Sequence, residues 1–406
     1  MRIGIDVTCW SNNRGFGRYL RELLGALARV PQHDEFILFA DQQTAPRVIV
    51  PPGWLLRVAG TREAPTRAAA ADSRRSLGDM WTLRRLVASE PLDLMFFPAV
   101  YSYFPVAGRV PCLVTFHDVI AETLPHLIFK SRRSRWFWNA KCRLALARAT
   151  RVLTVSEASK RGLMEHFGLA ADRIRVMPEA ASDAFRPADR DDPAHREALA
   201  RHGVTIGERF LLYVGGISPH KNIDTLLNGF ARIADTAARQ DVRLVIVGDY
   251  KGDSFRTCHE DLASQAARLG ITQRVLFTGF VSDDDLRHLY AACQAFVFPS
   301  YLEGFGLPAV EAMACGAAVV ASDRGSLPEV LDGAGAMFDP HDADALATAL
   351  ARLLDDPAWR DELRSRSLRR AADFSWDASA RRAIEVFHEF DPAARVGVAE
   401  RRPAHT

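Results

Sequence analysis

The amino-acid sequence predicts an α/β fold built on two parallel β-sheets. Three observations support this prediction. Short apolar runs rich in β-branched and aromatic residues recur along the chain, helical patterns lie between several of them, and the runs form two separate series. Strands that alternate with helices form parallel sheets covered on both faces. A chain of 406 residues is long enough for two such domains.

The two series of predicted strands divide the chain. The first series lies at residues 2–7, 35–40, 93–98, 112–118, 151–156 and 174–178. An amphipathic helical pattern, GRYLRELLGALARV, follows its first strand at residues 17–30. The second series lies at residues 210–216, 243–249, 275–280, 295–300 and 318–322. The segment between them, residues 186–199, is polar and rich in Pro and Asp, which predicts the domain boundary there.

We therefore expect an N-terminal domain at residues 1–185 and a C-terminal domain at residues 200–373. Residues 374–390 form an amphipathic helical pattern, long enough to reach back to the first domain. The tail at residues 391–406 is small and polar, so we expect it to be frayed. Residues 61–76 are rich in Ala and Arg without clear periodicity, which favours a flexible surface loop.

Composition is that of an ordinary globular protein, with 48% hydrophobic residues, 25% charged residues and a net charge of +2. Residues 1–185 carry 26 Lys and Arg against 17 Asp and Glu, whereas the remainder carries 26 against 33. No apolar run approaches the roughly 18 to 20 residues that span a bilayer, and the N-terminus reads as a strand. The six cysteines lack metal-binding or redox spacing and are expected to be reduced and mostly buried. These features favour a cytoplasmic protein.

Basic residues in the first half suggest a contact surface. Arginines cluster at residues 74–75 and 84–85 and in the segment 131–143, SRRSRWFWNAKCR, where three aromatic residues interrupt the charge. Cations beside aromatics suit an anionic membrane, such as the inner face of the cytoplasmic membrane. A solvated helix face with a core-facing aromatic stripe would produce the same pattern. Nucleic-acid binding is disfavoured, because the total charge is near zero and no nucleic-acid-binding motif is present.

The stretch at residues 298–316, FPSYLEGFGLPAVEAMACG, combines a short strand, a glycine-interrupted loop and a helix. Its glycines let the backbone approach a ligand closely, and Pro308 suits the first helical position. The helix N-terminus favours an anion, and two carboxylates seven residues apart suit a sugar joined to a phosphate. The same block is also an ordinary strand-to-helix connection. Its candidate binding residues are Glu303, Gly304, Phe305, Gly306, Leu307 and Glu311.

Other candidates directly follow predicted strands, because ligands of such proteins bind beyond the carboxyl ends of parallel strands. Lys221 would neutralise a diphosphate, which Gly215 and Gly216 would admit, with Asn222 beside it. A solvent-facing lysine before a helix is the alternative. Elsewhere in this half, Asp283 and Asp285 superficially form a metal-binding pair, but Ser282 with Asp285 has the form of a helix N-cap. The same explanation applies to Asp342 and Asp344 before another helix.

The first half offers two weaker candidates. His117 and Asp118 end a predicted strand, although an isolated His–Asp pair is also commonly a structural hydrogen bond. Gly15 and Gly17 follow the first strand and open a helix, so they allow a loop that approaches phosphates or an acceptor, with Arg14 or Arg18 adding charge. The glycine pattern alone is weak, and its position after the first strand gives it value.

The block at residues 298–316 closely resembles the signature of the retaining glycosyltransferases of family 4, the glycosyl transferases group 1. The resemblance spans nearly the whole chain and is strongest at residues 210–339. It implies the GT-B fold: two Rossmann-like domains facing across a cleft, with the C-terminal helix returning to the first domain. It further implies that the loop amides hold the donor's sugar and phosphate, that Glu303 lies near the sugar and that Glu311 binds the ribose.

The same resemblance places His117 at the donor sugar's hydroxyls, near the reacting centre, and Phe280 and Val281 at the nucleotide base. In that family an Arg usually follows the first glycine of the 215–222 loop, whereas this chain has Gly216. The departure leaves more of the phosphate charge to Lys221 and the helix ends. Asp249 and Glu329 are further candidates for contacts with the nucleotide or the acceptor.

The implied reaction transfers a sugar from a nucleotide donor to an acceptor hydroxyl with retention at the anomeric carbon. His117, Lys221 and Glu303 would lie nearest to the chemistry, and cation and N–H donors would stabilise the leaving diphosphate without a metal or other cofactor. The segments VGGISPHKN, VGDYKGDSF and TFHDVI are similar to bacterial mannosyltransferases of polysaccharide assembly. That similarity favours GDP-mannose over the UDP-sugars. The expected acceptor is a saccharide or a lipid-linked saccharide.

Two alternatives stay open. A sugar-nucleotide epimerase has the same architecture but needs an acid–base set in the cleft, where this chain shows the transferase spacing. A catalytically silent protein could use the fold for binding alone, and the intact Lys221, Glu303 and Glu311 argue against it.

Overall fold

The computed structural model describes residues 1–12, 15–61, 76–250 and 257–392 and divides the chain into two compact units. The first unit contains Met1–Glu179 and the chain from Trp376 on, and the second contains Ala180–Ser375. Arg14, the pair at residues 74–75, and most of the predicted loop at 61–76 and tail at 391–406 lie outside the described residues. The polar segment at residues 186–199 belongs to the second unit, where α8 (Pro193–Arg201) contacts α11 (Asp283–Ala292).

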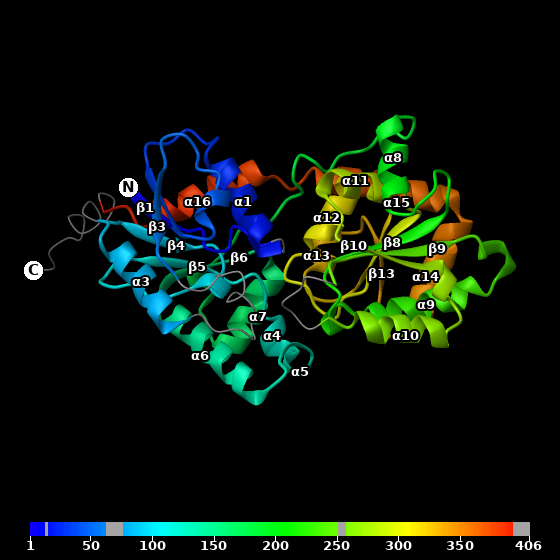
Figure 1. Ribbon diagram of the computed structural model, residues 1–406, viewed down its shortest axis with the longest axis horizontal. Coiled ribbons are helices and arrows are strands. Elements are labelled where there is room, and N and C mark those ends of the chain that lie inside the picture. Colours follow the sequence, from blue (N-terminus) through cyan, green and yellow to red (C-terminus); the bar gives the residue numbers. More distant parts are fainter. Residues whose placement is uncertain (13–14, 62–75, 251–256, 393–406) are drawn as a thin grey trace, which may run out of the picture. The chain divides into compact units, whose positions relative to one another are not determined.

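The first unit contains a seven-stranded parallel sheet in the order β3-β2-β1-β4-β5-β6-β7. Its strands are β1 (Arg2–Asp6), β2 (Glu35–Asp41), β3 (Leu55–Ala59), β4 (Leu94–Phe97), β5 (Cys112–Thr115), β6 (Ala149–Thr154) and β7 (Ile174–Val176). Its helices are α1 (Gly15–Leu27), α3 (Leu77–Ala88), α4 (Ile120–Thr123), α5 (Pro125–Ile128), α6 (Arg132–Arg148), α7 (Glu157–Phe167) and α16 (Trp376–His388). Figure 1 shows α1 and α16 on one face of this sheet and α3, α6 and α7 on the other.

Consecutive residues of β4 show why both faces must be covered, because neighbouring side chains of a strand point to opposite faces. Phe97 joins the core cluster that includes Leu83 of α3 and Cys142 of α6. Phe96 points the other way, and its ring centroid lies 5.5 Å from that of Phe387 in α16. The C-terminal helix is therefore part of the core of the first unit, as predicted.

The second unit repeats the arrangement with a six-stranded parallel sheet in the order β10-β9-β8-β11-β12-β13. Its strands are β8 (Phe210–Val214), β9 (Arg243–Val247), β10 (Val275–Gly279), β11 (Ala295–Phe298), β12 (Val319–Ser322) and β13 (Ala336–Phe338). Its remaining helices are α9 (Ile223–Ala234), α10 (His259–Arg268), α12 (Leu307–Ala314), α13 (Leu327–Leu331), α14 (Ala343–Asp355) and α15 (Pro357–Ala371). Two Rossmann-like domains are thereby confirmed.

Both sheets reverse their strand order once, next to their first strand. In the first unit the reversal lies between β1 and β4, and in the second it lies between β8 and β11. Open parallel sheets bind ligands beyond the carboxyl ends of the strands at such a reversal. The fold therefore directs attention to the loops that follow β8 and β11.

Two smaller expectations concern the cysteines and the membrane. The six cysteines are free thiols, and five of them are buried while Cys258 is half-buried. Across the described ranges, no helix combines the length and the apolar character that crossing a bilayer requires.

Candidate active site

The loops after β8 and β11 place Lys221 and Glu303 together at the strand-order reversal of the second sheet. The ammonium of Lys221 lies 2.6 Å from Glu303 Oε1, and it lies 5.6 Å from the centroid of the Phe298 ring at the end of β11. The two side chains are only 17% and 9% exposed. Predictions from the sequence treated these residues as separate contacts, for phosphate and for sugar. The structure shows one ion pair that holds both side chains in place.

The loop from Glu303 to α12 has a backbone that requires glycine. Gly306 has φ of +99° and precedes α12, and a Cβ there would lie 2.7 Å from Leu327 Cδ2. Pro308 falls in the first turn of α12, where its missing N–H leaves no helical bond unmade. The helix N-terminus is therefore delivered beside Glu303, as the block at residues 298–316 predicts.

Gly325 and Ser326 contact the backbone of this loop and help to fix it. Neither residue was identified from the sequence. The Ser326 hydroxyl donates to Phe305 O at 2.7 Å and to Glu303 O at 3.2 Å. Gly325 has φ of +62°, and a Cβ there would lie 2.7 Å from Glu303 O. The signal that could have found them is their position, directly after the predicted strand at 318–322 and before a helix.

Glu311 lies on α12 and is 3% exposed. The Tyr290 hydroxyl donates to Glu311 Oε2 at 3.4 Å. The carboxylate is thus fixed by α11 from within the second unit, and its predicted contact with a ribose stays a prediction.

Asn222 has a structural role at the same edge. It is fully buried, has φ of +57° and precedes α9. Its side-chain amide donates to Pro299 O at 2.9 Å and to Pro340 O at 2.7 Å. Both amide protons therefore bind the loops after β11 and β13, so this side chain fixes the scaffold around Lys221 and does not offer its N–H groups to a ligand.

The glycines after β8 lie in a closely packed turn. The Tyr213 hydroxyl donates to Gly216 O at 2.9 Å, and burial, with the charge of Glu303, raises the pKa of Tyr213. Gly248, after β9, has no room for a side chain, because a Cβ there would lie 2.3 Å from Gly215 O. The loop that carries Lys221 is thereby held against the neighbouring strand.

The residues after β10 differ in exposure. Phe280 is 65% exposed, whereas Val281 is buried. The Ser282 hydroxyl accepts from the Asp285 N–H at 3.3 Å, so the predicted N-cap of α11 is confirmed. The Asp285 carboxylate pairs with Arg201 at 2.6 Å and with His202 at 2.9 Å. Asp342 likewise accepts from the Asp344 N–H at the start of α14.

In the first unit, His117 follows β5 and both of its ring nitrogens have partners. Nε2 donates to Pro98 O at 2.9 Å, and Nδ1 lies 3.3 Å from Glu179 Oε1. The Tyr19 ring of α1 meets the imidazole edge-on, with centroids 4.7 Å apart. Glu179 was not identified from the sequence, because 62 residues separate it from His117. Asp118 Oδ1 accepts from the Ile120 N–H at the start of α4.

The loop after β1 meets α1 at a point that only glycine allows. A Cβ on Gly17 would lie 2.0 Å from Asn12 O, whereas Gly15 faces open space at the start of α1. Arg18 is half-buried on the same helix. Because Tyr19 contacts His117, this glycine loop and the histidine lie at one edge of the first sheet.

Both halves of the chain match known families. Residues 13–182 match Glycosyltransferase Family 4, and residues 196–372 match Glycosyl transferases group 1. The O-antigen chain mannosyltransferase B of Escherichia coli is 33% identical over 276 residues, which is 68% of this chain and 69% of that protein. The D-inositol 3-phosphate glycosyltransferase of Frankia alni is 37% identical over 61% of each chain.

Other similarities are more partial. The serotype-specific mannosyltransferase WbdA of Escherichia coli is 35% identical over 59% of this chain, but the match spans only 29% of that protein. Among solved structures, the sucrose-phosphate synthase of Thermosynechococcus elongatus has a TM-score of 0.73 at 22% identity, covering 96% of this chain and 98% of that one. The glycosyltransferase WaaG has a TM-score of 0.71 at 16% identity, covering 95% and 99%. Together with the two matched halves, these likenesses show that the chain is a glycosyltransferase of family 4, group 1, with the GT-B fold.

Proposed function

We propose that the protein transfers mannose from GDP-mannose to an acceptor hydroxyl, with retention at the anomeric carbon, in the assembly of a cell-surface polysaccharide or glycolipid. The observation that carries the proposal is the Lys221–Glu303 ion pair beside the N-terminus of α12 at the strand-order reversal of the second sheet. Relatives named as mannosyltransferases support the choice of sugar.

The charges at this edge suit the departure of a nucleoside diphosphate. When the sugar–phosphate bond breaks, negative charge develops on the diphosphate, and a cation with N–H donors aimed at it lowers the barrier. Lys221 and the N-terminus of α12 would take that task. Glu303, held by the lysine, would orient the sugar's hydroxyls. His117 would add a substrate contact through the first domain and need not act as a base.

Nucleotide preference is the most direct test of the donor. GDP, UDP and ADP are added separately, and the unfolding temperature of the second unit is followed. A nucleotide at about one hundred times its Kd stabilises the folded state by about 2.7 kcal/mol, so the specific one should raise the temperature by several degrees. We expect the rise with GDP. A rise with UDP alone would contradict GDP-mannose as the donor but would remain consistent with a glycosyltransferase.

Product analysis then separates the transferase from its alternatives. The expected outcome with GDP-mannose and an acceptor is a new α-linked product, because the donor is α-linked, and NMR of the anomeric proton shows it. An isomerised donor formed without acceptor would indicate an epimerase. Nucleotide binding with no transfer or hydrolysis of any sugar nucleotide would indicate a binding protein.

Membrane contact by the first unit is the remaining part of the proposal. The three aromatic residues of α6 differ in exposure. Trp138 is buried, whereas Trp136 is 64% and Phe137 is 37% exposed. Arg133 lies over the Phe137 ring at 5.8 Å from its centroid. Exposed aromatics beside arginines suit the interface of an anionic bilayer, where a lipid-linked acceptor would be presented.

A further inference from the structure

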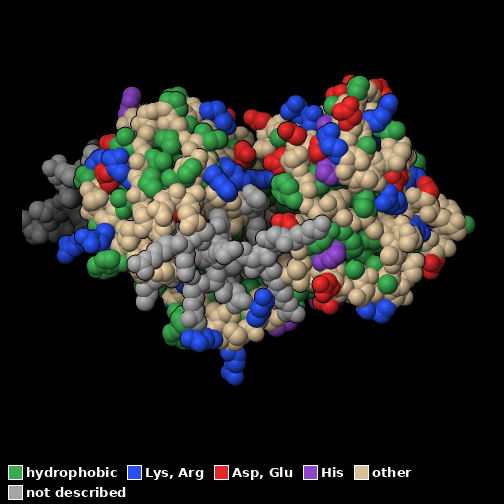
Figure 2. Space-filling view, viewed as in Figure 1, with side chains coloured by type: hydrophobic (Ala, Val, Ile, Leu, Met, Phe, Trp, Pro, Cys, Tyr) green, Lys and Arg blue, Asp and Glu red, His purple; other side chains and the backbone are tan. Residues whose placement is uncertain are grey.

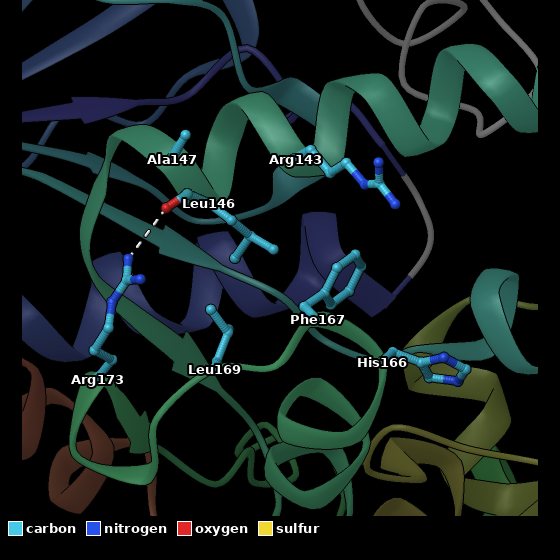
Figure 3. Close-up of a pocket in the computed structure, with 7 residues that line it drawn as sticks. All are labelled: Arg143, Leu146, Ala147, His166, Phe167, Leu169 and Arg173. Atoms are coloured by element: carbon cyan, nitrogen blue, oxygen red, sulfur yellow. Dashed lines mark hydrogen bonds between the residues drawn. The ribbon is translucent and has the colours of Figure 1, made fainter.

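A pocket of about 430 Å³ lies in the first unit between α6 and α7. Figure 3 shows its lining: Arg143, Leu146, Ala147, His166, Phe167, Leu169 and Arg173. A neighbouring pocket of about 140 Å³ shares three of these residues and adds Glu122, Arg135 and Asn139. We call the two together the α6–α7 groove.

The larger pocket of the α6–α7 groove lies away from the candidate active site of the first unit, whereas the smaller one includes Glu122 of α4, which follows His117 and Asp118 along the chain. The α6 residues of the larger pocket are at the end of that helix, directly before β6, while Phe167 ends α7 and Leu169 lies between α7 and β7. The larger pocket therefore sits toward the amino ends of these strands, whereas His117 follows the carboxyl end of β5. None of the predicted site residues lines either pocket. The larger pocket is thus not explained by sugar transfer.

Charge and apolar surface are arranged separately within the groove. Arg173 and Arg143 lie at opposite sides of a floor formed by Leu146, Phe167 and Leu169 (Figure 3). Arg173 is fixed, because its guanidinium donates to Leu146 O at 3.1 Å and to Ala149 O at 2.8 Å. Arginine suits phosphate oxygens through paired N–H donors, and an apolar floor suits a hydrocarbon chain.

The carboxyl among the lining residues does not cancel this positive charge. Glu122 accepts from the Trp138 indole N–H at 2.7 Å. Burial raises the pKa of Glu122 to about 7, so near neutral pH this group carries only part of a negative charge. Arg135 and Arg143 line the same smaller pocket. The groove therefore keeps a net positive charge.

Helix α6 connects the groove to the exposed aromatic surface. Arg135, Asn139 and Arg143 are spaced by four residues, so they form one stripe along the helix. Trp136 lies at the start of this stripe and is 64% exposed. In Figure 2, Lys and Arg side chains project from the lower edge of the view, where Figure 1 places α6.

We propose that the α6–α7 groove binds the phosphate headgroup of an anionic membrane lipid, with the adjoining part of its hydrocarbon chain on the apolar floor. The Arg143 guanidinium contacts the phosphate, the hydrocarbon chain lies on the floor between Arg143 and Arg173, and Trp136 enters the headgroup layer. This inference rests on the proposed membrane contact and names the site responsible for it. The occupant is a lipid of the bilayer and not a free anion, because the floor between the arginines is apolar.

The test is flotation of the full chain with vesicles of phosphatidylcholine, with and without phosphatidylglycerol. Arg143→Glu reverses one charge in the groove, and Arg47→Glu makes the same change at an exposed arginine of the first unit outside α6. Ala147→Trp fills the groove without changing its charge. A basic residue near an anionic surface contributes roughly 1 kcal/mol, so we expect Arg143→Glu to weaken binding at least about fivefold. Ala147→Trp should weaken it comparably and Arg47→Glu less than about twofold.

Four results would overturn the proposal. Equal losses for Arg143→Glu and Arg47→Glu would indicate diffuse attraction, and full binding by Ala147→Trp would show an unused groove. Equal binding to pure phosphatidylcholine would exclude headgroup recognition. Release from the vesicles by sodium phosphate, but not by sodium chloride of equal ionic strength, would indicate a site for free anions. Unfolding temperatures verify that each variant folds, and GDP stabilisation of the same samples tests the proposed function independently.

Discussion

Lys221 is the residue at which the proposed chemistry can be tested most directly. Lys221→Ala removes the cation that pairs with Glu303 in the loop before α12 and leaves that buried carboxylate without its ionic partner. We expect turnover to fall at least about tenfold, which corresponds to about 1.4 kcal/mol of transition-state stabilisation, while the fold survives. Steady-state kinetics with the preferred donor measure this. Lys160→Ala, which removes a partly exposed lysine of α7, is the matched control. Near-normal turnover of Lys221→Ala would refute the phosphate assignment.

Gly325, which follows β12, and Gly270, which follows α10, form a matched pair of glycines. Gly325→Ala and Gly270→Ala both place a side chain at positive φ, +62° and +71°. That strain alone costs about 1–2 kcal/mol. The new Cβ at 325 would also lie 2.7 Å from Glu303 O, whereas nothing lies within 4 Å at 270. Urea unfolding should show the larger loss for Gly325→Ala, and only this variant should lose nucleotide affinity. Equal losses, with nucleotide affinity retained by both variants, would show that Gly325 does not position Glu303.

The contact between α8 and α11 should be sensitive to acid. His195 and His288 are buried with their Nδ1 atoms 3.0 Å apart. Burial and nearby arginines lower both pKa values below 6.5, with Arg190 acting on His195 and Arg287 on His288. The folded state therefore binds fewer protons than the unfolded state, so stability should fall as the pH drops from about 6.5 through the lowered pKa values.

Unfolding temperatures at several pH values measure this effect. His288→Gln removes one titrating ring and keeps an amide that can bond His195, so the loss of stability on acidification should shrink. An unchanged loss in this variant would assign the acid sensitivity to other groups. Hydrogen bonds from Arg201 and His202 lower the pKa of Asp285, although its burial acts in the opposite direction. Protonation of Asp285 therefore reduces the stability of the fold only at a lower pH than the histidines do.

How far the sequence predicts an element depends on how strongly that element is buried. The central strands were predicted because unbroken apolar runs mark strands covered on both faces. Strands β3 and β13 were missed because they are short edge strands with incompletely buried side chains. In the site, the glutamates and Lys221 follow strands and could be found. Glu179 and Ser326 also follow predicted strands, but their partners lie 62 and 23 residues away along the chain, so their roles could not be read from the sequence.

At the scale of the whole molecule, the first compact unit is built from two separate segments of the chain. The first unit is completed only by α16, which follows the entire second unit in sequence. Ser379 of α16 donates to Pro178 O at 2.5 Å, and Glu389 pairs with Arg151 at 3.0 Å and with Arg175 at 2.9 Å. The second unit, in contrast, is one continuous segment with its own sheet and core. Each unit should therefore respond separately to mutations in its own core.

A pair of core phenylalanines tests this independence. Phe387 packs on Phe96 in the first unit, and Phe230 of α9 is fully buried beneath Arg274 in the second. Replacing either by alanine should cost about 3–5 kcal/mol. In calorimetry, Phe387→Ala should lower one unfolding transition and Phe230→Ala the other, and GDP should raise only the transition that Phe230→Ala lowers. If both variants lowered a single shared transition equally, the units would unfold together, because coupling between them would exceed the stability of either alone.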